Sequence, residues 1–257
     1  MPSAQHLRAQ IEANLAARIP SALTPLPRVP SPVAPTGIRE IDALLHGGFP
    51  VGALSEIVGP ECSGRTSLAF AFVAGMTQEG KVCAWVDVSD TLHPESAAAL
   101  GVDLSRLLWI RCGVHAGTAP LRKLWSRLEQ GLKVSDLLLQ AGGFSCIVLD
   151  MGSLPAEYAL RVPLATWFRF RAAAERLQAN VLLLTQHACS RNSAGLVLRL
   201  NPGNVLNLDS TIFTGLEHTA ELTRQRFPKD NVLPLRKQPQ SVQTAAWQTR
   251  TVWAGPR

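Results

Sequence analysis

The chain has 257 residues, of which 46% are hydrophobic and 17% charged, with a formal net charge of +6. This length suffices to bury the core of an α/β domain. No apolar run approaches the roughly 20 residues of a membrane-spanning helix, and no signal peptide is evident. The five cysteines lack metal-ligand spacing or a pairing pattern. These features exclude a disulfide-rich or membrane-spanning protein and favour a cytoplasmic one.

The chain begins with a predicted helix and a linker. Residues 3–18 are helical in pattern, and their apolar positions recur every four residues, at Leu7, Ile11, Leu15 and Ile19. One such stripe suits docking on another subunit or partner, or folding back onto the chain's own core. Repeated prolines then predict an extended linker. We therefore expect an N-terminal helix at 1–19 and a proline-rich linker at 20–35.

Apolar runs alternate with helical segments from residue 36 onward. The runs are continuous, as in strands that are buried on both faces of a parallel sheet. Strands are expected at 53–58, 82–87, 107–111, 145–150 and 180–185. Helices are expected at 37–45, 65–77, 94–100, 117–140 and 163–179. The pattern predicts an α/β fold with a mostly parallel central sheet and helices on both faces.

Shorter segments follow residue 190, bounded by prolines and by Asn-Pro-Gly at 201–203. We expect them to be antiparallel strands that extend the sheet, followed by a less ordered tail. The expected strands are 195–200, 210–217, 219–226 and 245–253. These expectations divide the chain further into a core at 36–217 and basic C-terminal strands and tail at 218–257.

A glycine-bounded loop between the first core strand and its helix has the pattern of a phosphate-binding loop. Two glycines let successive backbone N–H groups converge on an anion, and the helix dipole adds positive potential. The residues expected to bind nucleotide are Gly59, Pro60, Glu61, Cys62, Ser63, Gly64, Arg65, Thr66 and Ser67. The alternative is a strand-to-helix turn that binds nothing.

The lysine of this pattern is replaced by Arg65. Arginine keeps the charge but is planar and bulky, so the two residues are not equivalent at a tight site. We expect phosphate affinity to survive better than the geometry for phosphoryl transfer. ATP and Mg²⁺ are therefore candidate cofactors, and the alternative is that neither binds.

An acidic residue ends the apolar run at 145–150. Asp150 is placed to hold a magnesium ion through water, with the Thr66 hydroxyl as a second candidate magnesium residue. The alternative for Asp150 is a carboxylate that caps the following turn. A glutamine, Gln186, follows the run at 180–185.

Arginine carries most of the positive charge. Arg161, Arg169, Arg171 and Arg176 are expected along one helix, and further basic residues are spread through the C-terminal part. Such charges fit either a solvated surface or an acidic partner such as nucleic acid. No aromatic residues alternate with these charges as a stacking platform for single strands requires.

Several ordered motifs between residues 36 and 200 resemble the RecA recombinase core. They are TGIREIDALLHGGFPVGALSEIVGPECSGRTSLA, GKVCAWVDVSDTLHP, AAALGVDLSRLLWIR, IVLDMGSL and NVLLLTQ. The resemblance implies a RecA-like fold and gives Gln186 the role of γ-phosphate sensor. It places the water-activating acid at Ser89, the adenine-stacking aromatic at Ser96 and the base-contacting acid at His93. Because none of these has the required chemistry, we assign no catalytic residue and expect weak or absent ATPase activity. One alternative is a divergent DNA-dependent ATPase with Arg65 and Asp90 in adapted roles. Another is a regulator of RecA filaments that binds them through the N-terminal helix.

The two loops that hold single-stranded DNA in RecA are short in this chain. Few residues separate Leu154 from Pro163, or Gln186 from Leu196. We therefore expect direct DNA binding to be weak or nonspecific. The whole combination resembles the ImuA family of RecA-like accessory proteins, which act in DNA-damage-induced mutagenesis. That resemblance implies a scaffolding role for a nucleoid-associated cytoplasmic protein. Its partners would be a RecA-type recombinase and a Y-family polymerase-like protein. Trp247 and Trp253 are candidate anchors for the polymerase-like protein. The alternative is that these two tryptophans pack on an edge strand.

Overall fold

The computed structural model describes residues 4–15, 32–113, 122–208, 212–225 and 243–250. The chain divides into two units, one formed by 1–30 with 229–233 and the other by the rest. In the first unit the structure describes the helix α1 (Ala4–Leu15), within the predicted segment 3–18. Ile19 and most of the predicted linker lie outside the described residues.

The second unit is built on one large sheet. Its strand order is β10-β9-β8-β3-β7-β6-β4-β5, and β8 to β5 in this order run parallel. The parallel strands are β3 (Leu54–Val58), β4 (Cys83–Asp87), β5 (Leu107–Arg111), β6 (Cys146–Asp150), β7 (Asn180–Thr185) and β8 (Leu196–Leu208). The short strands β1 (Val33–Ala34) and β2 (Phe49–Pro50) pair separately. The predicted α/β fold with a mostly parallel central sheet is confirmed.

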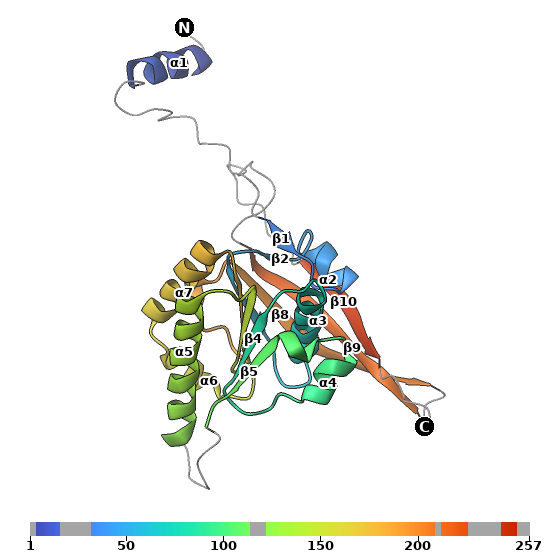
Figure 1. Cartoon of the computed structure of the whole chain (residues 1–257). Coiled ribbons are helices and arrows are strands. Elements are labelled where there is room, and N and C mark those ends of the chain that lie inside the picture. Colours follow the sequence, from blue (N-terminus) through green and yellow to red (C-terminus); the bar gives the residue numbers. More distant parts are fainter. Residues whose placement is uncertain (1–3, 16–31, 114–121, 209–211, 226–242, 251–257) are drawn as a thin grey trace. The chain divides into compact units, whose positions relative to one another are not determined.

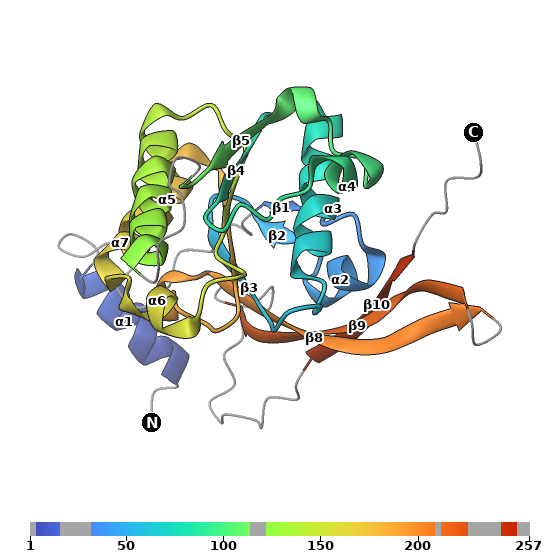
Figure 2. The same ribbon diagram turned by 90° about the horizontal axis from the view of Figure 1, so that it is seen from below.

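Helices cover both faces of this sheet (Figures 1 and 2). One face packs on α2 (Arg39–Leu44), α3 (Arg65–Gln78) and α4 (Pro94–Ala99), and the other on α5 (Arg122–Ala141), α6 (Ala156–Arg161) and α7 (Leu164–Leu177). Every residue of β3, β4, β6 and β7 is buried. This double coverage explains why their sequences are continuous apolar runs.

The antiparallel extension differs from the sequence prediction in two ways. The predicted break at 201–203 is wrong, because β8 runs through these residues with a register shift between Pro202 and Val205. A bulge accommodates the missing N–H of a proline inside a strand. The two strands predicted at 210–217 and 219–226 are one strand, β9 (Ile212–Gln225), which pairs with β10 (Gln243–Arg250). The end of the predicted core at residue 217 therefore lies inside β9.

The arginines expected along one helix belong to two. Arg161 ends α6, whereas Arg169, Arg171 and Arg176 lie on α7, and Val162-Pro163 separates the helices. Pro163 ends the first helix because a residue before proline avoids the helical conformation.

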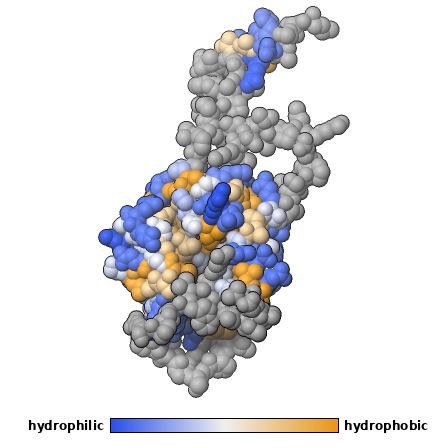
Figure 3. All heavy atoms as spheres, turned by 90° about the vertical axis from the view of Figure 1, so that its right-hand side faces the viewer, coloured by the Kyte–Doolittle hydropathy of each residue, from blue (hydrophilic) through white to orange (hydrophobic). Residues whose placement is uncertain are grey.

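On the face shown in Figure 3, hydrophobic and hydrophilic residues are interspersed.

A buried carboxylate joins the central strand to the chain that follows β7. Glu56, fully buried in β3, accepts hydrogen bonds from the N–H groups of Cys189 (2.7 Å) and Ser190 (3.3 Å), the hydroxyl of Ser190, and the hydroxyl of Thr185 (3.3 Å). These donors satisfy a charge that would otherwise be costly to bury. The segment after β7 is therefore held against the core.

Glu56→Ala should lower the free energy of unfolding by about 3 kcal/mol, because it leaves buried N–H groups without an acceptor. Glu56→Gln should lose less, since its amide oxygen still accepts. Urea denaturation followed by circular dichroism measures both. The control is Glu95→Ala, whose parent side chain is 92% exposed. Equal stability of the two alanine variants would contradict this role.

Candidate phosphate-binding site

The predicted phosphate-binding loop connects β3 to α3, at the carboxyl ends of the parallel strands. Val58 ends the strand, Gly64 is the residue before the helix, and Arg65 opens it. Asp150 ends the nearby β6, and Gln186 follows β7, which pairs with both β3 and β6. This edge is where ligands bind in open α/β sheets.

Both loop glycines approach the C-terminal strands closely. A Cβ atom at Gly59 would lie 2.4 Å from the carbonyl oxygen of Leu200 in β8. Gly64 has a φ of +87°, and a Cβ there would lie 2.8 Å from Cζ2 of Trp247 in β10. Only glycine fits at such distances, so β8 and β10 form one wall of the loop.

The loop residues differ in exposure. Ser63 is buried, and its hydroxyl has no hydrogen-bond partner among the described residues. Thr66 is exposed and Ser67 half-buried in the first turn of α3. The first turn of a helix carries backbone N–H groups without a partner inside the helix. The exposed remainder of the loop is Pro60, Glu61 and Cys62.

Arg65 turns into the protein. Its side chain is 8% exposed, and Nη2 donates to the carbonyl oxygen of Gly152 at 3.1 Å. Nη1 is buried without a partner in the described part of the chain. Burial lowers the pKa of the guanidinium, and the nearby Asp150 and Glu61 oppose that shift. The arginine therefore holds the segment after β6.

Three of the predicted site residues meet around Gly152. Gln186 Nε2 donates to the same carbonyl oxygen at 3.0 Å, and the N–H of Gly152 donates to Oδ1 of Asp150 at 2.9 Å. A Cβ at Gly152 would lie 3.1 Å from that Oδ1 and 3.3 Å from the Arg65 guanidinium. The sequence prediction missed Gly152. Its only signal was a glycine two residues after the acid that ends β6.

Asp150 is buried in a desolvated environment. Burial raises the pKa of its carboxyl to about 6, with Asp87 contributing, whereas the Gly152 N–H and Arg65 lower it. A proton competes with a metal ion for such a group. No cluster of three or more candidate metal ligands occurs in the described residues. The buried donors without partners, Ser63 Oγ and Arg65 Nη1, fit an anion such as a phosphate better than the acids fit Mg²⁺.

The acids near Ser89 are already engaged. Asp87 accepts from the N–H groups of Thr91 (3.0 Å) and Leu92 (2.8 Å), which fixes the loop after β4. Asp90 makes two hydrogen bonds with Arg111, at 2.6 and 2.8 Å, and this pairing lowers the pKa of Asp90. A carboxylate held in this way is a weak base.

The two residues expected to recognise adenine, His93 and Ser96, are hydrogen-bonded to each other. His93 is the N-cap of α4, and its Nδ1 accepts from the N–H of Ser96 at 3.2 Å. The same nitrogen lies 2.9 Å from the Ser96 hydroxyl. Both residues are exposed and serve to start a helix.

Trp247 is buried. It is 4% exposed and stacks on His218 of β9, with ring centroids 4.7 Å apart. The expectation that Trp247 anchors a partner is therefore wrong, because the ring packs against the phosphate loop. Trp253 lies outside the described residues.

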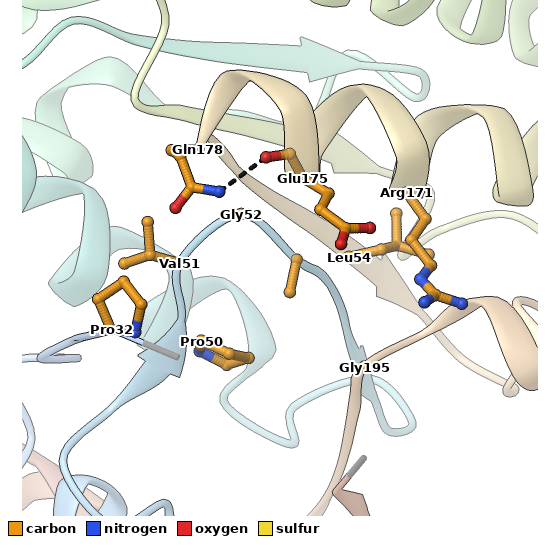
Figure 4. A pocket seen from close by; sticks show the side chains of 10 residues that line it. Pro32, Pro50, Val51, Gly52, Leu54, Arg171, Glu175, Gln178 and Gly195 are labelled. Atoms are coloured by element: carbon orange, nitrogen blue, oxygen red, sulfur yellow. Dashed lines mark hydrogen bonds between the residues drawn. The ribbon is translucent and has the colours of Figure 1, made fainter. Parts of the chain in front are cut away.

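A separate pocket lies at the other end of β3, before Leu54 (Figure 4). Gly52 and residues of α7, including Arg171 and Glu175, line it, and Gln178 Nε2 donates to the Glu175 carbonyl oxygen at 2.7 Å. No predicted site residue lines this pocket, so it belongs to neither the loop nor its surroundings.

Comparison with known proteins shows similarity to the RecA family. Residues 27–157 match the RecA N-terminal domain. RecA of Salinispora tropica is 37% identical over 125 residues, which are 48% of this chain and 32% of that protein. RecA of an Arthrobacter species is 37% identical over 124 residues, with the same coverage. The match thus spans about a third of these relatives' length. The crystal structure of the RadB recombinase has a TM-score of 0.56 at 22% identity, covering 83% of this chain and 94% of that one, and shows the shared fold.

Among the described helices, none is long and apolar enough to cross a bilayer.

Asp150→Asn should stabilise the protein above pH 6 and not below pH 4. The folded carboxyl has a pKa of about 6, above the ordinary 3.8, so the folded state holds the proton more tightly. The free energy of unfolding therefore falls as the pH rises from the ordinary pKa to the folded pKa. Asparagine cannot ionise, so it removes about 2 to 3 kcal/mol of that loss. Urea denaturation at pH 4 and pH 8 measures the difference. Glu95→Gln, an exposed carboxyl, is the control, and a pH-independent effect of Asp150→Asn would contradict the assignment.

Proposed function

We propose that this chain, which belongs to the RecA N-terminal domain family, is an accessory protein in DNA-damage-induced translesion synthesis. In this proposal it binds a RecA-type recombinase and a Y-family polymerase-like protein, with weak or absent ATPase activity. The resemblance to ImuA proteins suggests this role. One observation carries the argument: Nη2 of the Arg65 guanidinium donates to the carbonyl oxygen of Gly152, so only Nη1 is left for a phosphate.

The phosphate loop in this proposal still binds an anion. Ser63 Oγ, Arg65 Nη1 and the N–H groups that open α3 would hold the phosphates of ATP. Bound ATP would supply a γ-phosphoryl group for transfer to water. Thr66 is exposed at the loop and would be the candidate residue for an accompanying Mg²⁺. Asp150 is less suited, because burial raises the pKa of its carboxyl to about 6 and a proton therefore competes more strongly with the ion.

Hydrolysis lacks the groups it needs in this proposal. Ser89 has no base beside it that could activate water, since Asp90 is paired with Arg111. Gln186 donates to the Gly152 carbonyl oxygen and is engaged there. These contacts favour a binding role over the alternative of a divergent DNA-dependent ATPase.

The two segments that correspond to the DNA-binding loops of RecA each bury part of their residues in the core. The first, between Leu154 and Pro163, contains α6, and its residues Tyr158, Ala159 and Val162 are buried. In the second, Cys189, Ser190 and Ser193 are buried. Arg224 also donates a hydrogen bond to the carbonyl oxygen of Arg191. The exposed arginines of these segments are Arg161 and Arg191, which could neutralise only a few phosphates. This supports weak or nonspecific DNA binding in a cytoplasmic, nucleoid-associated protein.

The purified chain should hydrolyse ATP no faster than background, with or without single-stranded DNA. Arg65→Lys should bind ATP roughly tenfold more tightly, because lysine lacks the fork that engages Gly152 and gains about one charge-assisted hydrogen bond to phosphate. Its hydrolysis should stay at background, since Ser89 is unchanged. Phosphate release and equilibrium dialysis measure the two quantities. A DNA-stimulated rate that Asp150→Ala abolishes would instead establish the divergent ATPase.

The partner prediction is independent of nucleotide. The tagged chain should capture RecA and the purified Y-family polymerase-like protein of the same organism. Capture in EDTA without ATP should equal capture with Mg·ATP. Arg65→Ala should capture both to the same extent, because the proposed scaffolding does not pass through the loop. Failure of the unmodified chain to capture either protein would refute the accessory role.

A further inference from the structure

The antiparallel strands β9 and β10 place two aromatic rings against the phosphate loop. Trp247 and His218 are register partners in these strands, and their rings stack with a 34° tilt. Both residues are buried, at 4% and 2% exposed. A Cβ at Gly64 would meet Trp247 Cζ2 at 2.8 Å and His218 Cδ2 at 3.1 Å. The rings therefore pack on the residue that precedes Arg65.

Packing of this kind fixes the loop backbone. Gly64 has a left-handed conformation at the start of α3, and the rings occupy the space that a side chain would need. Leu200 of β8 blocks the equivalent space at Gly59. Closely packed interiors transmit small displacements instead of absorbing them. A shift of the loop on binding an anion would therefore be transmitted to the Trp247 ring.

The polar atoms of the two rings are only partly satisfied. His218 Nε2 lies 3.2 Å from the hydroxyl of Thr249, two residues beyond Trp247. His218 Nδ1 and Trp247 Nε1 are buried without a hydrogen-bond partner among the described residues. Buried polar atoms without partners cost free energy, so a shift that gave these two atoms partners would lower that cost. The two rings can therefore shift when a ligand binds nearby, whereas a pair of apolar side chains without unpaired polar atoms would gain nothing by shifting.

We propose that Trp247 and His218 are positioning residues of the phosphate loop that couple its occupancy to the C-terminal strands. The coupling rests on the proposed function, in which the loop binds ATP. A ligand that orders the loop changes the packing of β10 through Gly64, and linkage requires the reverse effect to be equal.

The test uses the full chain, Mg·ATP as the probe, and tryptophan fluorescence. ATP should change the emission of the unmodified protein, and Trp247→Phe should abolish that change. The matched control is Trp167→Phe, because Trp167 is fully buried in α7 on the opposite face of the sheet. The control should respond as the unmodified protein does. The proposal is overturned if Trp247→Phe keeps the full change in emission. It is also overturned if the unmodified protein binds ATP without any change in emission.

Affinity provides the second measurement. Equilibrium dialysis should give a Kd for ATP that Trp247→Ala and His218→Ala raise by roughly five- to tenfold, as for ordinary coupling between sites. Trp247→Phe should restore most of the affinity, because a ring still covers Gly64. A purely structural role would lower stability without this rescue. If an alanine variant does not fold, the fluorescence comparison still decides the question.

The two failures are distinguishable. If the unmodified chain binds no ATP in dialysis, the coupling is refuted, while capture of the polymerase-like protein and RecA would leave the accessory role intact. If ATP binds and the variants bind it equally well, the coupling is refuted and the phosphate site remains.

Discussion

The hydrogen bond from Arg65 to the carbonyl oxygen of Gly152 determines how the rest of the site is arranged. A buried guanidinium needs acceptors, and this carbonyl is the one that the described part of the chain supplies. Gln186 donates to the same oxygen, and the N–H of Gly152 donates to Asp150. One glycine therefore links α3, β6 and the end of β7. Arg65 consequently acts as a structural contact between a helix and a strand end.

The loop itself depends on a second constraint, the close approach of β8 and β10 to its glycines. Gly59 and Gly64 are needed here because Leu200 and Trp247 leave no room for a Cβ. A glycine-rich phosphate loop is usually explained by the anion alone. In this chain the same glycines also satisfy packing against the C-terminal strands. The spacing of the motif would therefore be required even if phosphoryl transfer had been lost, so the motif alone does not argue for a motor.

The sequence predicted those features that local pattern determines. The strands β3, β4, β6 and β7 were placed to within one residue at each end, because buried parallel strands are continuous apolar runs. Asn201-Pro202-Gly203 predicts the end of a strand, but β8 continues through it with a register shift between Pro202 and Val205, because pairing with β9 overrides the local signal. Gly152 and the burial of Trp247 were not predictable, because both follow from contacts between residues 65 and 152 and between 64 and 247. Local periodicity contains no information about such distant pairs.

The charges retained at the site argue that it still has a ligand. Arg65 and Asp150 are both desolvated, and replacing buried charges by apolar residues of similar volume is often neutral or stabilising. Arg65 Nη1 and Ser63 Oγ add two buried donors with no partner in the described chain. Each such donor costs about 1 to 3 kcal/mol, which an accepting anion would offset. An anion bound at the loop would therefore relieve a cost that the empty loop bears. The same groups, without a base to activate water, favour a site that binds an anion and reports its presence to β10 without consuming it.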